Sequence, residues 1–123
     1  MPTGRPVVHF EIHGKDRKKL QEFYAKLFGW KIDSNDAMNY AMIEAGVGGP
    51  VEGVGGGIAG SDAAPRVSIY VQVVDPADTL RQVESMGGKT VMPPMAVPGG
   101  PEIAQFSDPE GHLIGLVKAG SGM

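Results

Sequence analysis

Hydrophobic and polar residues alternate in two stretches of the chain, and a helical pattern follows each stretch. In residues 7–13 the alternation separates apolar from polar side chains: Val8, Phe10 and Ile12 on one side, and His9, Glu11 and His13 on the other. A period of two is typical of a strand with one buried face. A helix is predicted next, because Asp16 is a suitable N-cap and Gly29 a suitable left-handed stop.

The second alternating stretch, residues 67–73, repeats this plan. Asp75 and Pro76 open the next predicted helix, which should end near Gly88. Asp75 lies thirteen residues before Gly88, as Asp16 lies thirteen before Gly29. The chain therefore contains an internal repeat with a shift of fifty-nine residues, which aligns His9 with Ser68.

Three shorter strand candidates follow each predicted helix. They are residues 30–33, 39–44 and 54–58 in the first half, and residues 89–93, 102–108 and 112–118 in the second. The fold class predicted is therefore α+β, with two βαβββ modules that form curved mixed sheets around a cleft. We assign the modules to residues 6–60 and 66–118 of one domain spanning 1–123.

Composition and charge narrow the function classes. The 123 residues include no cysteine, which excludes thiolate metal ligands and a thiol nucleophile. The formal net charge is -3 and the eleven basic residues are scattered, so nucleic acid is not an expected partner. The first residues lack the pattern of a signal peptide, and no apolar run reaches the ~20 residues of a membrane span. A cytoplasmic protein that does not bind membranes is expected.

Several short motifs carry a family resemblance over residues 6–118. They are "VVHFEI" before Asp16, "FYAKLFGW" at 23–30, "VQVVD" before Asp75, "MGGK" at 86–89, "PPMAVPG" at 93–99 and "DPEGH" at 108–112. Together they resemble the vicinal oxygen chelate superfamily, which includes glyoxalase I, bleomycin-resistance proteins and extradiol dioxygenases. The helix motif and the "DPEG" turn particularly resemble its small glyoxalase-related branch. The resemblance implies a homodimer with a small-molecule ligand in the cleft.

The resemblance also implies a divalent metal in the cleft, held by side chains from the first strand of each module and from a last strand. His9 stands at the first of these positions. The second position is Ser68, where a histidine is usual, and the third is Gly115, where a glutamate is usual. Because two of the three positions lack the residue that is usual in the superfamily, we expect no metal at the usual site. Zn, Ni, Mn or Fe held by atypical ligands is the alternative.

The polar face of residues 7–13 does not supply a metal site by itself. Same-face residues of a strand lie about 7 Å apart, whereas such a metal holds nitrogen or oxygen ligands at about 2 Å. We interpret His9 and Glu11 as a candidate general acid-base pair, with a paired structural carboxylate as the alternative for Glu11. His13 is expected at the surface, and His112 is expected to be structural, in the turn.

The remaining candidate site residues are proposed to contact a ligand. They are Ser68, Tyr70, Gln72, Met42 and Gln105. The favoured function is binding of a small organic molecule in the cleft without the usual metal. A metal-dependent lyase, similar to lactoylglutathione lyase, or a dioxygenase with atypical ligands is the second hypothesis, and a non-catalytic interaction module is the third.

Overall fold

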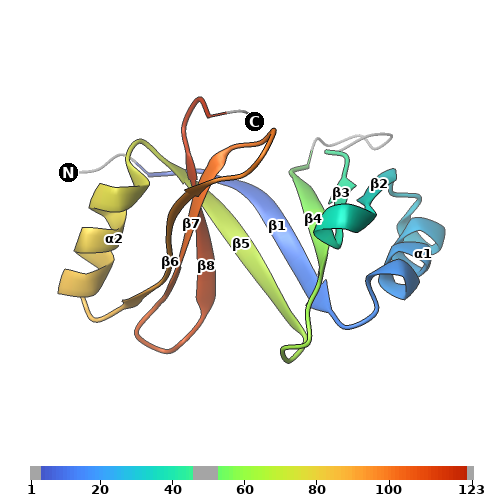
Figure 1. Cartoon of the computed structure of the whole chain (residues 1–123), viewed down its shortest axis with the longest axis horizontal. Helices are drawn as coiled ribbons and strands as arrows, with labels where there is room; N and C mark the ends of the chain where they lie inside the picture. Colours follow the sequence, from blue (N-terminus) through green and yellow to red (C-terminus); the bar gives the residue numbers. More distant parts are fainter. Residues whose placement is uncertain (1–3, 46–52, 122–123) are drawn as a thin grey trace. The chain divides into compact units, whose positions relative to one another are not determined.

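The computed structural model describes residues 4–45 and 53–121, and its elements follow the predicted repeat (Figure 1). The first half contains β1 (Val7–Gly14), α1 (Arg17–Phe28), β2 (Ile32–Asn35), the short 3-10 helix η1 (Asp36–Met38), β3 (Tyr40–Ile43) and β4 (Gly55–Gly60). The second half contains β5 (Arg66–Val73), α2 (Pro76–Ser85), β6 (Lys89–Ala96), β7 (Glu102–Ser107) and β8 (Leu113–Lys118). The predicted α+β class and the βαβββ order of each half are confirmed.

The chain divides into two compact units, and His9–Val67 is one of them. Its strands lie in the order β2-β3-β4-β1. β1 and β4 are parallel, with Glu11 opposite Gly57, while β3 runs antiparallel to both β2 and β4. The adjacent strands β1, β4 and β3 therefore present one continuous face to each side.

Helix α1 covers one face of this sheet. The core beneath it consists of Ala41, Ile43 and Ile58, with Phe10, Ile12, Leu20, Tyr24, Trp30 and Ile32 packed around them. The Tyr24 and Trp30 rings stack with centroids 5.3 Å apart. Because strand side chains alternate, burying Phe10 and Ile12 under α1 turns His9, Glu11 and His13 to the opposite face.

The second unit, from Ser68 onward with the residues up to Val8, has the strand order β5-β8-β7-β6. β5 and β8 are parallel, with Tyr70 opposite Gly115. Its core contains Val73, Leu80, Ala104 and Leu116. The first half of β5 departs from the usual strand pattern, in which apolar side chains are buried and polar ones are exposed. Ser68 and Tyr70 are buried, whereas Val67 is 69% exposed, because the core reaches only Val71 and Val73 of that side.

The predicted helix ends and the "DPEG" turn are also found. The Asp16 side chain accepts a hydrogen bond from the Lys19 backbone N–H, and Gly29 ends α1 with φ 69°. The Asp108 Oδ1 accepts hydrogen bonds from the backbone N–H groups of Glu110 and His112. His112 is therefore a turn residue, as expected. Within residues 4–45 and 53–121, no helix is long and apolar enough to cross a membrane.

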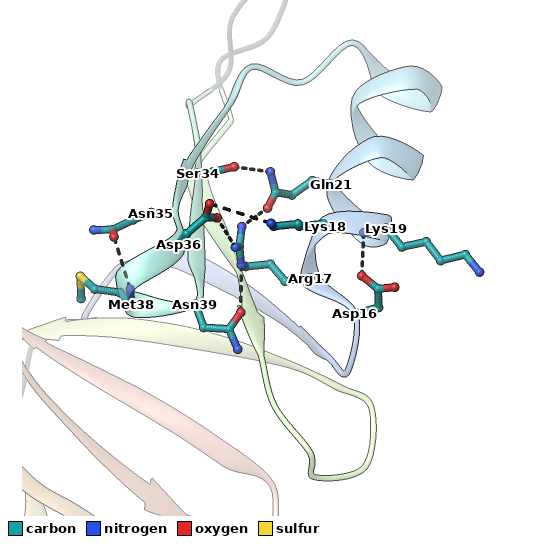
Figure 2. Close-up of polar contacts among 10 residues, drawn as sticks. All are labelled: Asp16, Arg17, Lys18, Lys19, Gln21, Ser34, Asn35, Asp36, Met38 and Asn39. Carbon is teal, nitrogen blue, oxygen red and sulfur yellow. Dashed lines mark hydrogen bonds and ion pairs between the residues drawn. The ribbon is translucent and has the colours of Figure 1, made fainter.

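A buried arginine ties the start of α1 to the β2–β3 connection (Figure 2). Arg17 is only 4% exposed, and its guanidinium donates to Asp36 Oδ1 at 2.5 Å and to Asn39 Oδ1 at 3.1 Å. It also donates to Gln21 Oε1, one turn along the helix. The hydrogen bond from Arg17, and the charge of Lys18, lower the pKa of Asp36 below its usual value. These contacts fix the turn that immediately precedes Tyr40.

We expect Arg17→Gln to destabilise the fold by about 1.5 to 3 kcal/mol, the range for lost hydrogen bonds to a charged group. Urea unfolding measures the change. Lys18→Gln is the matched control, because Lys18 is 74% exposed and approaches Asp36 only to 3.9 Å. Equal effects of the two substitutions would show that the buried guanidinium has no special role.

Candidate functional site

A hydrogen-bonded network lies on the face of the first unit opposite α1. The Tyr40 hydroxyl donates to Glu11 Oε2 at 2.9 Å and lies 2.8 Å from His9 Nε2. The Glu11 Oε1 atom lies 2.9 Å from His13 Nε2. Both Glu11 and His13 are 8% exposed. The sheet thus places two imidazoles, a carboxylate and a phenol in one partly dry environment.

The position of Tyr40 depends on a glycine in the neighbouring strand. Tyr40 pairs with Ala59 of β4, and its ring extends over Gly57, the residue opposite Glu11. A Cβ atom added at Gly57 would lie 1.8 Å from the Tyr40 hydroxyl oxygen. Any larger residue at position 57 would therefore displace the hydroxyl that joins His9 to Glu11.

Burial lowers the pKa of His9 below its ordinary value of 6.5, and the negative charge of Glu11 opposes this shift. The imidazole is consequently neutral at pH 7. Because the single Tyr40 proton is donated to Glu11, the hydrogen between His9 and Tyr40 belongs to His9 Nε2. The other ring nitrogen, Nδ1, is then the acceptor and the basic atom of His9.

His13 is buried, so the expectation that it lies at the surface is wrong. His13 and Glu11 lie on the same face of β1, and the two buried side chains contact each other. Among the described residues, His13 Nε2 has no hydrogen bond of good geometry, although it lies close to Glu11 Oε1. His13 extends the polar network to the end of the strand.

A related arrangement occurs in the second unit. The Gln105 side-chain amide donates to the Tyr70 hydroxyl at 3.0 Å. The Tyr70 ring covers Gly115, where an added Cβ would lie 2.3 Å from a ring carbon. Ser68 is 4% exposed, and its Oγ has no hydrogen-bond partner among the described residues. In both units, a tyrosine ring therefore lies over a glycine of the last strand.

The structure brings some candidate site residues together and leaves others apart. His9 and Glu11 share the Tyr40 hydroxyl, and Tyr70 shares its hydroxyl with Gln105. The remaining three are Met42, Gln72 and the buried Ser68. Met42 is 51% exposed and pairs with Gly57, whereas Gln72 is half-buried and donates its backbone N–H to Pro6. The functional roles of all these residues stay predictions.

Sequence reasoning missed Tyr40 and Gly57. A signal was present for Tyr40, because the predicted strand 39–44 places it on the same side as Met42, which was selected. Gly57 could not be selected in the same way. It lies in a glycine-rich segment without alternation, and only the register of β1 with β4 shows that it stands opposite Glu11.

Comparisons with known proteins agree with this architecture. Residues 7–46 match the family model described as bleomycin resistance protein-like N-terminal. The Mn(II)-bound glyoxalase from Novosphingobium aromaticivorans is similar over 91% of this chain, with 27% sequence identity and a TM-score of 0.66. Methylmalonyl-CoA epimerase, in a complex with methylmalonyl-CoA, aligns over 96% of this chain with a TM-score of 0.69 and 16% identity. The chain has the vicinal oxygen chelate fold.

The likeness differs in extent between these relatives. The chain spans 38% of the length of the glyoxalase, but 97% of the length of the epimerase. A methylmalonyl-CoA epimerase from Streptomyces coelicolor, in complex with 2-nitronate-propionyl-CoA, aligns over 96% of this chain and 97% of its own, with 18% identity and a TM-score of 0.67. No characterised protein sequence gives a significant match. The comparisons therefore establish the vicinal oxygen chelate fold and leave the reaction open.

The side chains present do not fit the divalent metal usual in the vicinal oxygen chelate fold. A glutamate at position 115 would collide with the Tyr70 ring, and Ser68 supplies only a hydroxyl. Both oxygens of Glu11 already contact Tyr40 and His13. Within the ranges that the structure describes, no group of three histidine, cysteine, aspartate or glutamate residues could hold a metal ion. We therefore derive no chemistry through a metal.

Tyr40→Phe should keep the ring over Gly57 while removing the hydroxyl that joins His9 to Glu11. We expect a loss of about 1 to 3 kcal/mol in unfolding free energy, because buried polar atoms lose a partner. Chemical denaturation measures it. Tyr24→Phe is the matched control from the same unit, since Tyr24 contributes through ring stacking. Equal losses in both variants would argue against the Tyr40 bridge.

The lowered pKa of His9 predicts how stability depends on pH. As pH falls below about 6.5, the unfolded chain takes up a proton at His9 that the folded chain resists, so unfolding becomes more favourable. Above about 6.5 this contribution is constant. Denaturation midpoints between about pH 5 and about pH 8 should show a flatter dependence for His9→Gln than for the unchanged protein. The difference between the two curves is the measurement. A steeper curve for His9→Gln would contradict the assignment.

Proposed function

We propose that this protein binds a small organic molecule at the face formed by His9, Glu11 and Tyr40, without the metal usual in its fold. The observation that supports this most is the Tyr40 hydroxyl between His9 and Glu11. Buried polar groups are costly, and a network of them on a sheet face fits a role beyond packing. The exposed Met42 beside it would provide an adaptable apolar contact.

The protonation pattern suggests which ligands match the face. The negative charge of Glu11 lies beside the neutral His9 ring on this face. Acceptors and a carboxylate select hydrogen-bond donors and cations. The ligand we expect is therefore an aromatic or aliphatic molecule with an amine, amide or hydroxyl group. Tyr70, Gln72, Gln105 and Ser68 are proposed as further ligand contacts.

The same pair would also support general acid-base chemistry on a bound molecule. Because burial lowers the pKa of His9, its ring is unprotonated at pH 7, and Glu11 accepts a hydrogen bond on the same face. A base needs to reach the proton that it removes, to within about 3 Å in the complex. Binding is thus the primary proposal, and a reaction would require a ligand placed against His9.

The test is a thermal-shift screen of amines, amides and hydroxylated aromatic compounds, followed by calorimetric titration of the best compound. A ligand of the native state raises the melting temperature in proportion to its occupancy. We expect His9→Asn to weaken binding about 2- to 10-fold, the loss of one hydrogen bond. His112→Asn is the matched control, because His112 is exposed and forms a turn in the other unit.

Metal analysis of the same preparations separates this proposal from its competitors. Stoichiometric Zn, Ni, Mn or Fe that disappears in His9→Ala would overturn the metal-free site and favour the lyase or dioxygenase hypothesis. A stable protein partner in a pull-down, with no ligand found in the screen, would favour the interaction module. Equal affinities of His9→Asn and His112→Asn would place the ligand elsewhere.

A further inference from the structure

A pocket lies at the C-terminal end of β1, on the side covered by α1. It is a pocket of 490 Å³ formed by the end of β1, the first turns of α1 and the start of β5. Ile12, Leu20, Tyr24 and Val67 provide its apolar lining. Small-molecule sites usually have volumes of about 300 to 1,000 Å³, so its size suits a compact ligand.

Positive charge is concentrated around this apolar lining. Lys15, Lys19 and Arg66 all line the pocket. Asp16 is the single carboxylate in the lining, and it is engaged in capping α1 through the Lys19 backbone N–H. None of the three cations forms an ion pair within residues 4–45 and 53–121. In a chain with a net charge of -3, this is a local excess of positive charge beside an apolar surface.

Two neighbouring residues support a ligand rather than a simple charged surface. Val67 is 69% exposed although it lines the pocket, so an apolar side chain is left uncovered at its mouth. His13, which is 8% exposed, also lines the pocket and adds a buried polar group to its wall. A ligand that covers Val67 would remove apolar area from water, which favours binding.

We propose that this pocket binds a small organic anion with an apolar body, such as an aromatic carboxylate. The apolar part would lie against Leu20, Tyr24 and Val67, and the carboxylate would lie between Lys15 and Arg66. Charge complementarity favours this occupant over a cation or a neutral molecule. The pocket shares only His13 with the network of Glu11 and Tyr40, so its preference for an anion does not depend on the function proposed above.

The experiment titrates 1-naphthoate into the isotopically labelled full chain and follows backbone amide shifts. Shifts should concentrate at residues 12–20 and 65–67. The uncharged 1-naphthamide should bind about tenfold more weakly than 1-naphthoate, because it lacks the charge that the three cations attract. The Lys15→Gln/Lys19→Gln/Arg66→Gln variant should weaken naphthoate by a similar factor. Raising salt from about 0.02 M to about 0.5 M should weaken naphthoate more than naphthamide.

Lys18→Gln/Lys26→Gln is the matched control, since both lysines belong to α1 and neither lines the pocket. It should retain the affinity of the unchanged protein. Equal affinities for naphthoate and naphthamide would overturn the anion assignment. Inorganic phosphate binding as tightly as naphthoate would show that the apolar lining does not contribute to binding. Absence of shifts would reject the site. Concentration-dependent self-association that protects residues 65–67 would instead show that a second copy of the chain occupies the pocket.

Discussion

The candidate site depends on the close approach of a tyrosine ring to a glycine in each unit. Tyr40 lies over Gly57, and Tyr70 lies over Gly115. A glycine inside a strand costs about 0.5 to 1 kcal/mol relative to alanine, so its presence needs a compensating contact. Here the aromatic ring fills the space of the missing side chain. Through the pairing of Glu11 with Gly57 and of Tyr70 with Gly115, the two glycines occupy equivalent places in the repeat. The volume that a metal-binding carboxylate would need is occupied in both units.

The hydroxyl of Tyr40 is useful only if β3 is held in register, and the contacts of Arg17 provide that restraint. Its guanidinium fixes Asn39, the residue before Tyr40, while α1 buries the opposite face of the sheet. The start of a helix thereby positions a phenol on the far side of the strands. In this position the Tyr40 hydroxyl donates a hydrogen bond to Glu11, and burial keeps His9 neutral. The Tyr40 hydroxyl contacts both His9 and Glu11, so a single substitution at Tyr40 removes two contacts of the network.

Local patterns predicted most of the fold, because strand alternation, N-caps and glycine stops depend on neighbouring residues. Asp16, Gly29 and the "DPEG" turn are examples. The prediction was weaker wherever a tertiary contact decides the outcome. Ser68 and Tyr70 are buried while Val67 is exposed, which no alternation rule anticipates. His13 was expected at the surface, yet Glu11 retains it in the interior. The link between Tyr40 and Gly57 requires strand register, which a single sequence does not provide.

The fold alone does not determine the reaction, because one fold can carry sites of different chemistry. Both faces of β1 contribute to candidate sites in this chain. Glu11 joins the network with Tyr40, whereas Ile12, its neighbour, lines the pocket beside α1. His13 belongs to both, because it contacts Glu11 and also lines the pocket. Substituting His13 would disturb the two sites together and could not assign a function to either. Tyr40 and Lys15 each belong to one site only, so they are the residues through which the two functions can be separated.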